Sequence, residues 1–195
     1  MVGTVGSGGG RRGNRWRMAA WAVAALILLL PGLAMQITDE VAWDAADFAF
    51  AGALIVGTGI AYEIAAQMTA STAYRAAVGI ALAGAVALVW VNAAVGIIGT
   101  EDNPSNLMYG GVLAVAIIGA VVARFRPDGM ARALMATALA QASIVVVAVT
   151  AGMGHPASPP LEILGVNALF IALWLVSSWL FRKAARERSS AGAAP

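Results

Sequence analysis

Residues 107–132 have the sequence LMYGGVLAVAIIGAVVARFRPDGMAR, in which a long uncharged segment is followed by arginines at 124, 126 and 132. A hydrocarbon core about 30 Å thick needs about 20 apolar residues of helix to cross it. Arginines collect on the cytoplasmic side of such helices. This stretch therefore predicts a transmembrane helix over 107–123 that ends at the cytoplasmic surface.

The same pattern repeats along the whole chain of 195 residues. Sixty-one per cent of the residues are hydrophobic, 11% are charged and the mean hydropathy is +0.82. Ordinary soluble domains carry about 25% charged residues. Short gaps between apolar segments make consecutive helices antiparallel neighbours. We predict an all-α, polytopic membrane protein with the spans 18–35, 48–66, 76–99, 107–123, 133–153 and 163–181.

The charges indicate the orientation. With the N-terminus inside, the segments 1–17, 67–75, 124–132 and 182–195 contain all 12 basic residues. The other loops carry acids instead, which fits both termini in the cytoplasm. By composition the segments 1–15 and 185–195 are predicted to be disordered tails around a transmembrane domain, 16–184. The outer acids are Asp39, Glu40, Asp44, Asp47, Glu101 and Asp102.

Two features of this pattern have a second interpretation. Arginines in 11–17 before an apolar run also resemble a cleaved signal peptide, but the run is long for one and no A-x-A site follows it. Arg75 and 81–83 match Arg132 and 138–140 at an offset of 57, as in a repeated helical hairpin. The alternative is chance similarity between apolar helices, which we favour.

The candidate intramembrane polar site consists of Glu63, Asn92, Gln141 and Asn167, because polar groups are costly in lipid and often functional. They would form a cation site or a polar path between helices. The alternative is structural. Glu63 would reach the interface or pair with Arg75, and the amides would hydrogen-bond between helices. We favour the structural interpretation because Glu63 is only about one turn from the helix end.

A second candidate site is the extracytoplasmic loop with Glu101, Asp102 and Asn103, whose oxygens suit a hard cation. The alternative is turn and capping chemistry, with Ser105 or Asn106 capping the next helix. We favour capping because the loop lacks the Asp-x-Asp spacing of calcium loops.

The composition also excludes several chemistries. The chain has no cysteine and one histidine, His155, so disulfides, thiolate nucleophiles and multi-histidine metal sites within one chain are ruled out. No P-loop, nucleophile elbow or zinc-protease motif occurs in a suitable context. We expect no cofactor, no metal and no nucleic acid, since membrane orientation already accounts for the arginines. The aromatic residues that lie mostly near span ends are expected in belts at the membrane interfaces, and Trp90 is expected to pack between helices. The belt residues are Trp16, Trp21, Trp43, Trp174, Trp179, Tyr62, Tyr74 and Tyr109.

These observations favour a non-enzymatic membrane protein that acts by packing, as an accessory or assembly subunit or a homo-oligomer. A small transporter or channel is the alternative, and an intramembrane enzyme would lack the usual catalytic groups. Arginine outnumbers lysine, of which Lys183 is the single example, and Ala and Gly abound, as in GC-rich bacterial genomes. We therefore expect a multi-pass protein of a bacterial inner membrane.

Reporter fusions will test the orientation. We expect alternating signals along the chain, because every basic residue lies in the segments assigned to the cytoplasm. A far-side signal after Arg126 would contradict the topology. Expected cytoplasmic fusion points are Arg75, Arg126 and Arg186, and expected far-side segments are 38–44, 101–105 and 155–159.

Overall fold

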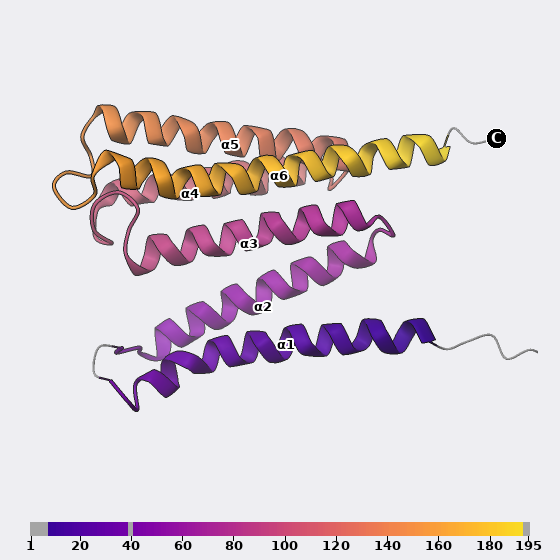
Figure 1. The fold of residues 1–195 in the computed structure, drawn as a ribbon, viewed down its shortest axis with the longest axis horizontal. Coiled ribbons are helices and arrows are strands. Elements are labelled where there is room, and N and C mark those ends of the chain that lie inside the picture. The colour runs from indigo at the N-terminus through magenta and orange to yellow at the C-terminus, as the bar shows by residue number, and fades with distance from the viewer. Residues whose placement is uncertain (1–7, 39–40, 193–195) are drawn as a thin grey trace, which may run out of the picture. The chain divides into compact units, whose positions relative to one another are not determined.

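The computed structural model describes residues 8–38 and 41–192, and within these ranges it contains helices and no strand. Six of the described helices are long and apolar enough to span a membrane, which confirms the predicted all-α, multi-pass architecture. The elements in Figure 1 are α1 (Gly8–Ala34), α2 (Ala45–Gln67), α3 (Thr72–Ala94), the short 3-10 helix η1 (Pro104–Leu107), α4 (Met108–Val122), α5 (Pro127–Thr150) and α6 (Pro160–Gly192).

Side-chain caps explain where two of these helices begin. Asp44 Oδ1 accepts the backbone N–H groups of Ala46 and Asp47 at 2.7 and 3.0 Å, and Asp47 Oδ2 accepts the N–H of Asp44 at 2.9 Å. This reciprocal arrangement satisfies donors that the first turn of α2 would otherwise leave open. Ser71 Oγ accepts the N–H of Tyr74 at 3.3 Å and so starts α3.

The chain divides into two compact units, residues 1–61 and residues 62–195. In the first unit the two helical segments approach through a small residue. A Cβ built on Gly59 would come within 2.6 Å of the Trp21 ring, so a larger residue would force this ring to shift. Among the side chains described in the first unit, Ala51 alone is buried. Packing within this unit therefore leaves most of its apolar surface uncovered.

The second unit is a bundle of α3, α4, α5 and α6. Helix α6 packs against both α3 and α5, and α4 packs against α5. The Trp174 ring of α6 lies against Gly84 of α3, where an added Cβ would be 3.3 Å from the ring. Helix α6 is therefore the element that joins α3 to the rest of the bundle.

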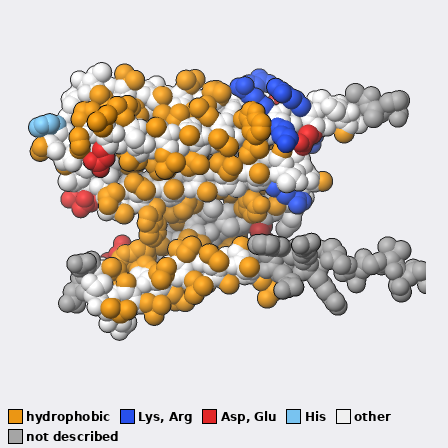
Figure 2. Space-filling model, viewed as in Figure 1, with side chains coloured by type: hydrophobic (Ala, Val, Ile, Leu, Met, Phe, Trp, Pro, Cys, Tyr) orange, Lys and Arg blue, Asp and Glu red, His pale blue; other side chains and the backbone are white. Residues whose placement is uncertain are grey.

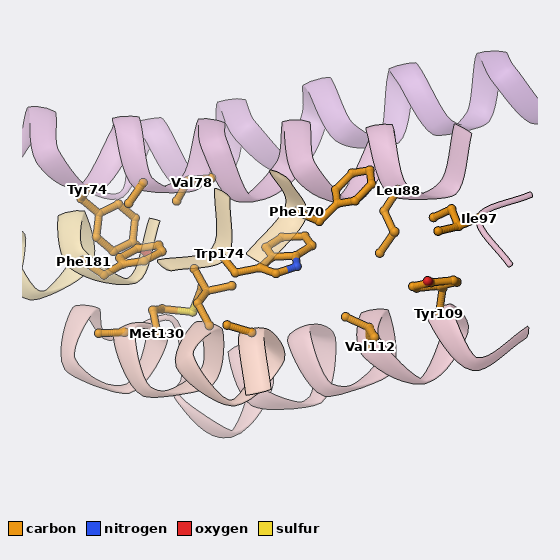
Figure 3. Close-up of a cluster of buried hydrophobic side chains, with 14 of the residues drawn as sticks. Tyr74, Val78, Leu88, Ile97, Tyr109, Val112, Met130, Phe170, Trp174 and Phe181 are labelled. Atoms are coloured by element: carbon orange, nitrogen blue, oxygen red, sulfur yellow. The ribbon is translucent and has the colours of Figure 1, made fainter. Parts of the chain in front are cut away.

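Aromatic side chains form much of the core of this bundle, as Figure 3 shows. Tyr74 packs edge-on against Phe181 with ring centroids 5.0 Å apart, and Trp174 and Tyr109 follow along the core. For three members of the predicted interfacial belt, Tyr74, Tyr109 and Trp174, the prediction was wrong, because these side chains are buried in the bundle. Position near a predicted span end does not show which way a ring points, and these rings point into the bundle.

Helix α3 ends at Ala94, whereas the sequence predicted a span to residue 99. The reason lies in the backbone. Gly96 and Gly99 have φ angles of 71° and 75°, in the left-handed region that an α-helix cannot contain. Apolar composition alone does not distinguish the last helical turn from the buried loop that follows, in which Ile97 and Ile98 are also buried.

Other helices extend further than their apolar segments. Helix α5 begins at Pro127, since proline is well tolerated in the first turn. Residues 8–15 and 185–192, predicted to be disordered, belong to α1 and α6 instead. In α6 the extension is held by packing, because Ala184 and Ala185 are buried, and by a 2.9 Å hydrogen bond from Ser71 Oγ to Glu187 Oε2. Residues 1–7, 39–40 and 193–195 lie outside the described part of the chain.

The approach of α4 to α5 is a test of this packing. A Cβ on Gly119 would lie 2.7 Å from Ala133 Cβ and 3.3 Å from Ala133 Cα, so the two helices would have to separate. We expect Gly119→Ala to lower the free energy of unfolding in detergent by about 1–3 kcal/mol. The matched control is Gly111→Ala in the same helix, where the added Cβ would meet no atom within 4 Å. The control should be neutral or stabilising by up to about 1 kcal/mol, and equal losses for both variants would contradict the packing.

Candidate functional site

Two of the predicted polar residues meet in the middle of the bundle. Gln141 of α5 and Asn167 of α6 are completely buried, and Gln141 Nε2 donates to Asn167 Oδ1 at 3.0 Å. The residues are far apart in sequence, and the pairing of α5 with α6 brings them together. The expectation that Gln141 faces other helices and not lipid is therefore confirmed.

Two aromatic side chains extend this pair at either end. The indole Nε1 of Trp174 donates to Gln141 Oε1 at 2.7 Å, and Asn167 Nδ2 donates to the Tyr109 hydroxyl at 3.0 Å. Asn167 Nδ2 also donates to the carbonyl of Ile163 at 2.8 Å. We call Tyr109, Asn167, Gln141 and Trp174 the polar chain. It links α4, α5 and α6 through groups that are at most 1% exposed.

Two adjacent serines of α6 add bonds to neighbouring backbones. Ser177 Oγ donates to the carbonyl of Ala77 in α3, and Ser178 Oγ donates to the carbonyl of Ala131 in α5, both at 2.7 Å. Both serines are buried. Sequence reasoning missed them, although a pair of hydroxyl groups inside an apolar segment was the signal that could have found them. Each hydroxyl donates to a backbone carbonyl of a neighbouring helix. The two serines therefore fix the spacing between α6, α3 and α5.

Asn92, the third candidate amide, belongs to a separate network at the loop that follows α3. Its Nδ2 donates to the carbonyl of Asn106 at 3.2 Å. Asn106 is itself buried, and its Oδ1 accepts the N–H groups of Ile97 and Ile98 at 3.0 and 2.9 Å. Its Nδ2 donates to the carbonyl of Thr100 at 2.7 Å. The side chain of Asn106 thus replaces the helical bonds that α3 loses when it ends.

The same loop is tied to the connection between α5 and α6. Asn103 Nδ2 donates to the carbonyl of Met153 at 3.2 Å, and Ser158 Oγ bonds to both the N–H and the carbonyl of Gly99 at 3.2 Å. Asn103 Oδ1 accepts the N–H of Ser105 at 2.9 Å and caps η1. The prediction that Ser105 or Asn106 caps the spanning helix was wrong, because Asn103 caps η1 and α4 begins directly after η1 with no side-chain cap.

The two acids of this loop lie outside the hydrogen-bond network described above. Glu101 and Asp102 are exposed, next to a half-buried Asn103 whose amide is used by the loop itself. Among the described residues, no group of three or more His, Asp or Glu side chains is placed to hold a metal ion. His155 is exposed in the opposing connection.

Glu63 is not part of the polar chain. It is half-buried on α2, one turn before the last residue of that helix, Gln67. The guanidinium of Arg75, its expected partner, donates from Nε and Nη2 to the carbonyl of Thr69 at 3.1 and 2.8 Å. The structure therefore joins Gln141 to Asn167, and it leaves Glu63 and Asn92 in two other places.

Among the buried side-chain nitrogens and oxygens in the described part of the chain, the Oδ1 of Asn92 alone has no hydrogen-bond partner. All side-chain nitrogens and oxygens of the polar chain are bonded within the protein. The arrangement contains amides, a phenol and an indole, which donate and accept hydrogen bonds and carry no charge at neutral pH. Such a set is suited to holding helices together and contains no nucleophile paired with a base.

An all-helical, multi-pass membrane protein with a hydrogen-bonded bundle is the class that these observations define. No protein-family model, curated protein or solved structure matches the chain.

The polar chain predicts a specific coupling between α5 and α6. Asn167→Leu should lower the free energy of unfolding by about 1–3 kcal/mol, because it leaves buried groups of Gln141 and Tyr109 without a partner. Gln141→Leu should cost a similar amount, and the double variant less than the sum, with a coupling of about 0.6–1.7 kcal/mol.

Unfolding in mixed detergent micelles measures these values. The control is Ser143→Ala, since Ser143 is exposed on α5 and bonds to the carbonyl of Leu139 in its own helix. The control should change the free energy by no more than about 0.5 kcal/mol. Strictly additive losses for Asn167 and Gln141 would show that the two side chains do not interact.

Proposed function

We propose that this protein is a non-enzymatic, multi-pass subunit of a bacterial inner membrane that acts by packing against other membrane proteins, including copies of itself. The polar chain carries this proposal. A transport path through the bundle would need polar groups left available to a passing solute or to water. In residues 62–195 the deepest polar side chains bond to one another and to backbone carbonyls, as expected for a fixed scaffold.

The first unit supports a role in association. Its described side chains are almost entirely unburied, with Ala51 as the exception. On α2, Gly57 has no atom within 4 Å of the position that a Cβ would take. Small residues allow helices to approach closely in a membrane, where close van der Waals contact drives association. A helix of another subunit would find such a surface here.

The proposed topology is a series of antiparallel hairpins with both termini in the cytoplasm. Contacts in the second unit support opposite directions for α5 and α6, since Ala131 bonds to Ser178 while the later Gln141 bonds to the earlier Asn167. The face of this unit seen in Figure 2 has Lys and Arg side chains gathered at one end and the histidine at the other. Such a partition fits a protein oriented by its arginines.

Purification in mild detergent will test the association. We expect the protein to elute as an assembly heavier than its own 19.8 kDa, either with copies of itself or with a second membrane protein. Gly57→Leu should reduce the assembly, because the larger side chain keeps a second helix away. The matched control is Gly165→Leu on α6, which also has open space at the Cβ position and should leave the assembly intact.

A transporter would give a different result. A monomer with no partner, together with a proton or cation flux in vesicles that Glu63→Gln abolishes, would contradict the packing role. In a packing subunit the same change should have little effect, because a shallow carboxylate near the interface contributes at most about 1 kcal/mol through a surface ion pair.

A further inference from the structure

A cleft of about 810 Å³ opens at the arginine-bearing end of the second unit. It lies between the connection from α2 to α3, the connection from α4 to α5, and the last turns of α6. Arg124 and Arg126 come from the second of these segments, and Arg188 comes from the third. The orientation of the protein accounts for arginines on this side of the membrane, but it does not require three of them to border one cleft.

The wall of the cleft between α4 and α5 is held in an uncommon conformation. Arg124 and Phe125 have φ angles of 50° and 56°, in the left-handed region that costs free energy for any residue with a Cβ. The Tyr74 hydroxyl donates to the carbonyl of Phe125 at 2.8 Å and so fixes the loop to α3. Tyr74 is in turn held by its edge-on contact with Phe181. The backbone between the two arginines is thus held by the bundle core.

The charges around the cleft do not cancel. Two carboxylates, Asp128 and Glu187, border it beside the three guanidinium groups. Glu187 Oε2 accepts a 2.9 Å hydrogen bond from Ser71 Oγ. Asp128 lies in the first turn of α5, where the helix dipole favours a negative charge. Each carboxylate therefore has an interaction within the protein, and the lining keeps an excess of one positive charge.

We propose that this cleft binds the phosphate group of a membrane phospholipid. Guanidinium groups bind phosphate oxygens through two parallel N–H donors, and basic pockets at the cytoplasmic ends of helices hold lipid headgroups. Apolar surface continues from the cleft along the neighbouring helices. Met68 and Phe125 line it and are 64% and 50% exposed, and Val121 and Val122 of α4 are 60% and 76% exposed. Acyl chains lying on this surface would place the phosphate at the arginines, which favours a lipid over a soluble anion.

Native mass spectrometry of the 195-residue protein will test the site. The probes are phosphatidylglycerol, phosphatidylcholine and inorganic phosphate, each added to the delipidated protein in detergent. We expect wild-type protein to retain phosphatidylglycerol. The combined variant Arg124→Gln, Arg126→Gln, Arg188→Gln should bind this lipid with an affinity lowered by about tenfold or more.

The matched control removes the same charge elsewhere. Arg132, Arg182 and Arg186 are exposed and do not line the cleft. Their combined substitution by Gln should leave lipid retention within about twofold of wild type. Thermal melting in lipid-free detergent, equal for both triple variants, will show that each is folded.

Three results would overturn the proposal. Equal loss of lipid in both triple variants would mean that binding follows net charge and not the cleft. Retention of lipid by the cleft variant would exclude the site directly. Binding of inorganic phosphate that depends on the cleft arginines, without phospholipid retention, would assign the cleft to a soluble phosphate.

Discussion

The structure of residues 62–195 depends on the satisfaction of buried polar groups at helix α6. A buried amide without a partner costs about 1–3 kcal/mol, whereas a paired one contributes modestly. Asn167, Ser177 and Ser178 of α6 reach α4, α3 and α5 respectively, through the Tyr109 hydroxyl and the carbonyls of Ala77 and Ala131. Rotation or sliding of α6 would break all of these bonds together. The polar groups therefore fix the register of a bundle whose apolar side chains could pack in several ways.

The same constraint limits what the bundle interior can do. The two amides that the sequence singled out, Gln141 and Asn167, hydrogen-bond to each other. Their remaining polar atoms bond to other groups of the protein, Gln141 Oε1 to the indole of Trp174 and Asn167 Nδ2 to the Tyr109 hydroxyl. Interaction with a solute would first require these bonds to open. The surfaces available for function are then the lipid-facing helices, the described part of the first unit and the arginine-lined cleft at the ends of α4, α5 and α6.

Helices α3 and α4 end at opposite ends of the bundle, and different interactions hold the chain where each helix ends. Where α3 ends, Asn106 is buried and bonds the backbone at Ile97, Ile98 and Thr100. Where α4 ends, left-handed backbone at Arg124 and Phe125 turns the chain, and Tyr74 holds the turn. The first arrangement closes its end with neutral amides. The second leaves charged side chains around an open cleft, and the proposed phosphate site lies there for this reason.

The sequence by itself determined the class of fold and the number of spanning helices, because length and apolar composition are sufficient to place a helix in a bilayer. It also determined that Gln141 would face other helices, since a bare amide in lipid is costly. Only the tertiary structure decided which polar groups meet. Partners such as Gln141 and Asn167, or Ser177 and Ala77, depend on the rotation of each helix about its axis, and helices of Ala, Leu, Gly and Val carry too little amphipathic signal to fix that rotation in advance. The burial of Tyr74, Tyr109 and Trp174, and the gathering of three arginines around one cleft, follow from the same rotations.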